Sequence, residues 1–191
     1  MSRTADIEDA LLARVRDRFG ATLRQVDSIP ADWDDEMVLR FLLNAPAVFL
    51  SWGITRSSGS TDMTAEVDVQ WQFTVVTAHE GKEAARRRGD ARAIGAYDIV
   101  ERLIPLMHGF SAPDESALRF ESADNLFSAA SERRGMAVYG VLFSMPMAMQ
   151  DGDPPPSDLD DFLRFHADYD QQPTDGQIEA SDHVTLPQGA P

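Results

Sequence analysis

Residues 64–76 alternate between apolar and polar side chains at every second position, and no other feature constrains the fold as strongly. The apolar set is Ala65, Val67, Val69, Trp71, Phe73 and Val75, and the polar set is Glu66, Asp68, Gln70, Gln72 and Thr74. A period of two predicts a strand with one dry and one wet side, which is typical of an antiparallel sheet. About a dozen residues at ~3.3 Å each would reach ~40 Å, roughly twice the length of a usual strand.

A second alternating run lies directly before this strand. Val48, Leu50, Trp52 and Ile54 occupy alternate positions and are expected to share one face. Residues 57–62 are rich in serine and glycine and predict a turn between the two runs. The sequence therefore predicts a long hairpin. Because a small domain cannot easily cover such a hairpin, we expect it to project and to pair with another subunit.

Helices are expected on both sides of the hairpin. Ile7, Leu11, Val15 and Phe19 form a helical stripe that ends at Gly20. The remaining predicted elements are a weak strand (23–28), a short helix before Pro46, a helix over 82–108 that Pro105 bends or ends about one turn early, a short strand (118–120) and a strand over 136–145 buried on both faces. This order predicts an α+β domain in which two to three helices pack on one face of a mostly antiparallel sheet.

The charge divides the chain at a run of prolines. The 191 residues carry 17 Lys and Arg against 32 Asp and Glu, a net charge of −15. Residues 151–191 hold ten acids and one base, Arg164, which gives a net charge of −9. Pro154, Pro155 and Pro156 block both helix and central strand. We therefore predict a folded domain over 1–150 and an extended acidic C-terminal arm over 151–191.

Composition excludes several classes of protein. No apolar run approaches the ~18–20 residues that a membrane helix needs, and the N-terminus lacks the apolar stretch of a signal peptide. The absence of cysteine excludes disulfides, thiol catalysis and cysteine-based zinc sites. The acidic balance argues against broad nucleic-acid binding and favours a basic or charge-patterned partner.

No constellation of residues predicts catalysis. His79, His108, His166 and His183 have no metal-ligand spacing, and the chain lacks G-x-S-x-G, P-loop and G-x-G-x-x-G motifs. Neighbouring carboxylates such as Asp160 and Asp161 are typical of solvated turns. We expect no enzyme activity, no cofactor and no metal site.

A dense basic segment stands out in this acidic chain. Its members are Lys82, Arg86, Arg87, Arg88 and Arg92. One interpretation is an ordinary solvated helix start. The other is a contact surface, because cations near a helix N-terminus oppose the helix dipole and need a compensating partner, either an acidic surface or phosphates.

The acidic arm contains one aromatic motif. It comprises Phe162, Leu163, Phe165 and Tyr169, with the aromatic residues at i, i+3 and i+7, the spacing of a docking helix or a short linear motif. Two interpretations remain open: the motif packs back on its own domain, or it docks on a second copy of the chain.

Several stretches, taken in order, resemble one family. They are Ile7–Arg14, Pro30 with Trp33, Asn44–Phe49, Arg86–Gly89 followed by Gly95–Tyr97, His108 with Gly109, Asn125–Phe127, Gly135–Tyr139 and Phe162–Tyr169. Each stretch alone is a weak motif, and their order carries the specificity. Together they resemble the tail-terminator family of Mu-like phages and prophages, which is encoded between head-completion proteins and the tail sheath.

The resemblance implies a structural virion protein. Members form a homohexameric ring that caps the tail tube and joins it to the head connector. The implied partners are further copies of the chain, the tail tube protein, the tail sheath protein and a head-completion or connector protein, with DNA only as cargo in the lumen. The implied location is the virion tail or neck, after assembly in the host cytoplasm.

The sequence leaves two alternatives open. A head-completion or neck protein would differ in copy number, twelve-fold rather than six-fold. An acidic phage protein that mimics DNA and inhibits a host enzyme would need closely spaced carboxylates across the folded domain. The concentration of acids in the arm, and the interruption by Arg86–Arg88, argue against the second alternative.

Overall fold

The structure, a computed structural model of the chain, describes residues 2–30, 41, 43–60, 64–79, 83–91, 93–126, 135–150, 164–169 and 180–185. The chain divides into two compact units, residues 1–151 and 152–191, and each is described by itself. The first unit contains α1 (Arg3–Phe19), a 3-10 turn (Gly20–Thr22), β1 (Gln25–Ser28), β2 (Ala47–Ser60), β3 (Thr64–Ala78), α3 (Glu83–Arg88), α4 (Ala96–Met107), β4 (Arg119–Asn125) and β5 (Met136–Gln150). The second unit contains β6 (Arg164–Tyr169) and β7 (Ala180–Thr185).

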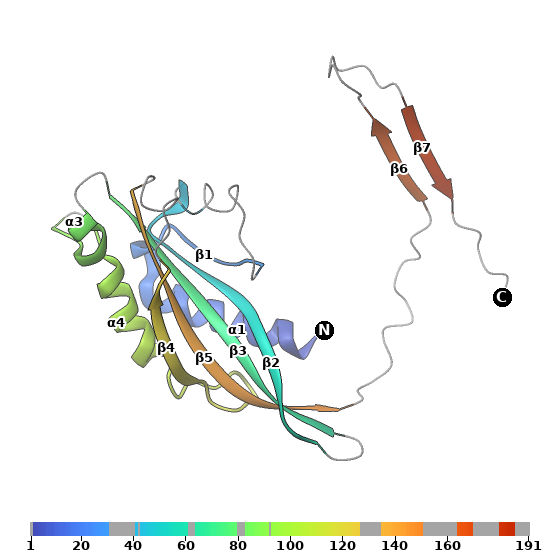
Figure 1. Cartoon of the computed structure of the whole chain (residues 1–191), viewed down its shortest axis with the longest axis horizontal. Coiled ribbons are helices and arrows are strands. Elements are labelled where there is room, and N and C mark those ends of the chain that lie inside the picture. The colour runs from blue at the N-terminus through green and yellow to red at the C-terminus, as the bar shows by residue number, and fades with distance from the viewer. Residues whose placement is uncertain are drawn as a thin grey trace. The chain divides into compact units, whose positions relative to one another are not determined.

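A five-stranded sheet in the order β1-β2-β3-β5-β4 forms the centre of the first unit (Figure 1). Only the β1–β2 pair is parallel among these neighbours. The central pair, β3 and β5, stays in register from Thr64 opposite Gln150 to Ala78 opposite Met136. The prediction of an α+β fold with a mostly antiparallel sheet is confirmed.

Helices α1 and α4 pack on one face of this sheet. Their buried residues join the odd-numbered face of β3 in a single apolar cluster, which includes Ile7, Leu11, Val15, Ile99, Leu103, Met107, Val69, Trp71 and Phe73. Phe73 meets Phe143 of β5 edge to face, with ring centroids 5.6 Å apart. Each of these large side chains stabilises the fold by about 1.5–3 kcal/mol through burial. The predicted first helix is confirmed and ends, as expected, before Gly20.

A smaller apolar cluster covers the opposite face near β1. It contains Ile29, Phe41, Ala45, Ala47, Phe49, Val76, Met136 and Val138, and Phe41 stacks on Phe49 at 4.7 Å. This second layer covers the even-numbered face of β5 at Met136 and Val138, so the predicted burial on both faces holds for the first part of the strand, whereas Leu142 is half-buried. It also corrects one prediction: Thr74 was expected on a wet face and is instead fully buried. Apart from residues 41, 43 and 44, the short helix expected before Pro46 falls outside the described residues.

Strand β2 contains a bulge that the alternating pattern does not reveal. Trp52 lies opposite Trp71, but the next described pair is Thr55 with Val69. The extra residue moves Ile54 out of the apolar face and leaves it 56% exposed. The predicted alternation is therefore correct through Trp52 and wrong at Ile54.

The helix predicted over 82–108 is broken in two. α3 ends at Arg88 and α4 begins at Ala96, and the chain turns between them at Gly89, whose φ is +71°. The backbones cross closely there, because a Cβ on Gly95 would lie 2.2 Å from the Gly89 nitrogen. Pro105 lies inside α4, which continues to Met107, so the predicted early end is also wrong. The proline leaves the carbonyl of Glu101 without its usual i−4 donor, and the helix still continues for two more residues.

Candidate assembly surfaces

Arg86 anchors the basic segment to the sheet from the last turn of α3, so the expectation that these arginines oppose the dipole at a helix N-terminus is wrong. Its Nε donates a hydrogen bond of 3.1 Å to the carbonyl oxygen of His79, and its own carbonyl accepts one of 2.8 Å from Thr77 Oγ1. A Cβ placed on Gly135, where φ is +69°, would lie 3.4 Å from the Arg86 guanidinium. This arginine therefore joins α3 to the ends of β3 and β5.

Arg87 also points into its own fold. Its Nη1 donates a hydrogen bond of 2.9 Å to the Tyr97 hydroxyl, and the guanidinium lies 5.8 Å from the centroid of the Tyr97 ring. Tyr97 meets Tyr139 of β5 edge to face at 5.8 Å. Arg88, by contrast, is exposed. Lys82 and Arg92 lie outside the described residues, so among the members that the structure describes only Arg88 is presented outward.

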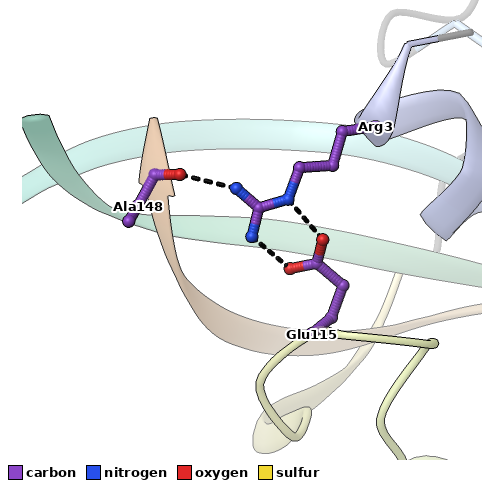
Figure 2. Close-up of polar contacts among 3 residues, drawn as sticks. All are labelled: Arg3, Glu115 and Ala148. Atoms are coloured by element: carbon purple, nitrogen blue, oxygen red, sulfur yellow. Dashed lines mark hydrogen bonds and ion pairs between the residues drawn. The ribbon is translucent and has the colours of Figure 1, made fainter. Parts of the chain in front are cut away.

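The edge of β5 beyond Ser144 is closed by an ion pair (Figure 2). Arg3 Nη1 donates 2.6 Å to the carbonyl oxygen of Ala148, while its Nε and Nη2 bind the carboxylate of Glu115. The Ala148 carbonyl points away from β3, and because backbone direction alternates along a strand, the backbone of Pro146 also faces away from β3. Proline has no N–H, so this position cannot donate a hydrogen bond to an added strand. The hydrogen bond to Glu115 raises the pKa of Arg3, and burial lowers it by less. This edge is therefore unable to accept another strand.

The opposite edge of the sheet is open over the second part of β2, residues Ser51–Ser60. β1 pairs with β2 only from Ala47 to Leu50, and no other described strand lies beyond it. The Leu50 carbonyl accepts a 2.8 Å hydrogen bond from Ile29, so it points away from β3. Alternation places the backbone groups of Trp52 in the same outward direction.

The outward direction continues after the bulge. In an antiparallel pair, the backbone N–H and C=O groups of two directly opposed residues either point toward each other or point away from each other. The β5 partners of Val67 and Val69 are Met147 and Met145, which alternate with Ala148 along the strand. Since the Ala148 carbonyl points away from β3, the backbone groups of these two partners point toward β3, so Val67 and Val69 form their main-chain hydrogen bonds with β5. Their β2 partners, Ser57 and Thr55, therefore point away from β3. We call this backbone row, which Trp52, Thr55 and Ser57 form, the open edge of β2.

Two large apolar side chains accompany the open edge. Trp52 is 46% exposed and Ile54 is 56% exposed, which singles them out in a strand whose first five residues are buried. The Trp52 indole donates a 3.1 Å hydrogen bond to Thr55 Oγ1, which fixes its orientation along the strand. Exposed apolar residues beside an unpaired backbone mark a surface that suits strand addition.

Comparison with known proteins decides the family. The model of the bacteriophage Mu Gp37 family matches residues 3–148. The chain belongs to the Mu Gp37 family. It is 39% identical over 139 residues to the probable tail terminator protein of Escherichia phage Mu, covering 73% of this chain and 71% of that protein. It is 30% identical over 187 residues to the Mu-like prophage FluMu protein gp37 of Haemophilus influenzae, covering 97% and 91%. The family assignment made from the sequence is confirmed.

The arm of this Gp37-family chain contains a strand pair. β6 and β7 are antiparallel, with Phe165 opposite Val184 and Tyr169 opposite Ala180. Residues 164–169 are therefore a strand and not the docking helix that the spacing allowed, while the choice between packing on its own domain and docking on a second copy stays a prediction. Phe162 and Leu163 lie outside the described residues. No other described strand joins this pair, which forms a two-stranded sheet of its own.

Sequence reasoning missed the residues that decide which edge is open. Arg3 and Glu115 are separated by 112 positions, and no local pattern connects them. Pro146 carried a signal, since a proline inside an apolar strand indicates an unpaired edge.

No helix among the described residues is long and apolar enough to cross a membrane. The described residues also contain no group of three side chains suited to holding a metal ion.

Proposed function

We propose that this chain is a structural tail terminator, which forms a homohexameric ring at the end of a phage tail tube and joins the tube to the head connector. The observation that carries the proposal is the family match over residues 3–148 together with the relation to the probable tail terminator of phage Mu. The matched range takes in every described element of the first unit except the last two residues of β5. The protein would therefore work through the surfaces of that fold.

The proposed partners follow from the position of such a ring. One side contacts the tail tube and sheath proteins, and the other contacts a head-completion or connector protein. DNA passes through the lumen as cargo, and the protein resides in the virion tail or neck after assembly in the host cytoplasm. We propose no catalytic role, which is supported by the structural use of Arg3, Arg86 and Arg87.

The long strands β2 and β3 supply the projecting part of the proposed subunit. They continue beyond the positions that β1 and β4 cover (Figure 1). The even-numbered face of β3 presents an exposed Glu66 and a half-buried Asp68, with Arg56 opposite Asp68. We assign this largely acidic face to the lumen, since a negative wall lets DNA pass without adhering.

The contact between neighbouring subunits is proposed to combine the basic segment with the acidic arm. Arg88 supplies the exposed charge, and Lys82 and Arg92 are proposed to act with it. Arg86 and Arg87 hold the segment in place through their contacts with His79 and Tyr97. On the arm, the proposed contacts are Phe162, Leu163, Phe165 and Tyr169. A ring with cyclic symmetry needs two different patches on each copy, and these two supply them.

Deleting the gene tests the proposal directly. Without a terminator, tube growth loses its stop, so electron micrographs should show tails of irregular and excessive length that carry no heads. Expression of the wild-type chain in trans should restore uniform tails. Tails of normal length that lack only heads would instead favour a neck protein, and the copy number per particle then separates six-fold from twelve-fold assembly.

A further inference from the structure

We infer that the open edge of β2 binds the β6–β7 strand pair of a neighbouring copy, so that the arm of each subunit extends the sheet of the next. The inference rests on the proposed ring and adds a main-chain contact to the one proposed between the basic segment and the acidic arm. Its occupant is a second copy of this chain, bound through main-chain hydrogen bonds.

The edge stretches that β5, β4 and β2 present differ in what they can accept. The β5 edge is closed by Pro146 and by the Arg3 contact with Ala148. On the β4 edge the Phe120 N–H is already bonded to His108 Nδ1 at 3.2 Å, which leaves a short stretch around Ala123. The open edge of β2 is longer and has no comparable cap among the described residues.

The strand pair needs what this edge offers. An isolated two-stranded sheet is marginally stable in water, and a third strand is the usual remedy. β6 and β7 each have six residues, the length of the stretch from Trp52 to Ser57. At ~3.3 Å per residue both segments span about 20 Å. The two incomplete sheets therefore match in length and in unmet hydrogen bonding.

A neighbouring copy is favoured by symmetry and charge. A ring requires heterologous contacts, and an edge on one unit with a strand pair on the other supplies two different surfaces on each chain. The open stretch of β2 contains one charge, Arg56, and the arm has a net charge of −9 from ten acids and one base. Added salt should therefore weaken the charge attraction between Arg56 and the acidic arm, and it should leave the main-chain hydrogen bonds largely unaffected.

The absence of cysteine makes a cross-linking test clean. Ser57→Cys places a thiol on the open edge, and Ala167→Cys or Asp182→Cys places one at the centre of β6 or β7, since these two residues are opposed. Tails are assembled with two full-length variants, each carrying one cysteine, and treated with a short bismaleimide. We expect a cross-linked dimer that contains both variants. The matched control is Ala123→Cys, an exposed residue on the β4 edge, which should give none.

Each other outcome overturns a defined statement. Tails that contain the chain but yield only the Ala123→Cys product, or no product, overturn the strand exchange and leave the terminator role intact. A doubly substituted chain that cross-links only within itself assigns the strand pair to its own subunit and also overturns the exchange. Absence of the chain from tails overturns the proposed function itself.

A proline variant gives an independent measurement. Thr55→Pro removes an N–H that points away from β3, so the β2–β3 ladder keeps its hydrogen bonds. The association of copies should weaken by about tenfold, the effect of one lost main-chain hydrogen bond. Ala123→Pro removes an outward N–H on the β4 edge and should leave association unchanged. Thr55→Val removes only the Oγ1 that accepts the Trp52 indole hydrogen bond, so it separates the loss of that bond from the loss of the main-chain N–H. Circular dichroism and thermal unfolding establish that both variants fold, and equal association of the two variants contradicts the inference.

Discussion

Arg3 and Glu115 form a bidentate ion pair that ties the first turn of α1 to the loop before β4. The side chain of Glu115 is 5% exposed, whereas that of Arg3 is 49% exposed. The third donor of the guanidinium binds Ala148 and closes the β5 edge. One surface arginine thus neutralises a buried charge and prevents strand addition at the wrong edge of the sheet.

Replacing this arginine should destabilise the fold. Arg3→Ala leaves the buried Glu115 carboxylate without its cation, and we expect a loss of about 1–3 kcal/mol, reduced from a fully buried pair by the exposure of Arg3. Urea unfolding measures the change. Arg18→Ala, an exposed arginine in the last turn of α1, is the control and should change stability by less than about 0.5 kcal/mol.

The pH dependence of the same pair follows from the direction of its pKa. Because the folded-state pKa of Arg3 is raised, its contribution is fully present below the unfolded value and is lost only as pH rises through the folded one. The unfolded-state pKa of Arg3 is that of an ordinary arginine and the folded-state pKa lies above it, so both are far above neutral pH. The difference between wild type and Arg3→Ala should therefore stay constant from neutral to mildly alkaline pH. A difference that falls over this range would contradict the assigned cause.

The turn between α3 and α4 should not tolerate a side chain at Gly95. A Cβ there would lie 2.2 Å from the Gly89 nitrogen and 2.5 Å from the Arg87 carbonyl oxygen, which are backbone atoms that cannot move alone. We expect Gly95→Ala to cost about 3 kcal/mol or more. Gly109→Ala is the control: φ is +80°, but no atom lies within 4 Å of its Cβ, so only about 1–2 kcal/mol of backbone strain is expected. Similar losses for the two variants, measured by thermal unfolding, would contradict this account of the turn.

The parts of the fold that were predictable are those with a local signal. The alternation of β3 and the stripe of α1 repeat within a few residues, and both elements were placed correctly. The bulge at Ile54 depends on the register with β3, which a single strand does not encode. The burial of Thr74 depends on a second apolar layer contributed by distant residues such as Phe49.

The candidate surfaces were harder to predict for the same reason. Lys82, Arg86, Arg87, Arg88 and Arg92 look equivalent in sequence, but Arg86 and Arg87 find acceptors on His79 and Tyr97 that only the folded chain brings near. A density of charge indicates a charged region, whereas the direction of each side chain depends on tertiary contacts. The open edge of β2 likewise became visible only when the short extent of β1 was known.

Two buried threonines of β3 should respond in opposite ways to the same substitution. Thr74 is 0% exposed and its hydroxyl has no hydrogen-bond partner among the described residues, whereas Thr77, 2% exposed, donates to the Arg86 carbonyl at 2.8 Å. Valine has nearly the same shape and no hydroxyl. Thr74→Val should therefore stabilise the protein by about 1 kcal/mol, and Thr77→Val should destabilise it by about 1–2 kcal/mol. Denaturant titration measures both, and a loss of stability in Thr74→Val would show that its hydroxyl has a partner.

Arg88 should affect assembly without affecting the fold. It is exposed in the last turn of α3, so Arg88→Glu should cost less than about 1 kcal/mol, mainly from the helix dipole. The reversal replaces attraction toward the acidic arm with repulsion, and the yield of complete tails should fall, most strongly at low salt where screening is weakest. Arg18→Glu makes the same change in the last turn of α1 and should leave tail yield unchanged. Complementation of a deletion, scored by tail counts in micrographs, compares the two variants.

Arg86→Ala belongs to a different class, because the loss of its bond to His79 should lower stability as well as yield. Normal tails from Arg88→Glu would remove Arg88 from the proposed contact and leave the open edge of β2 as the surface to test.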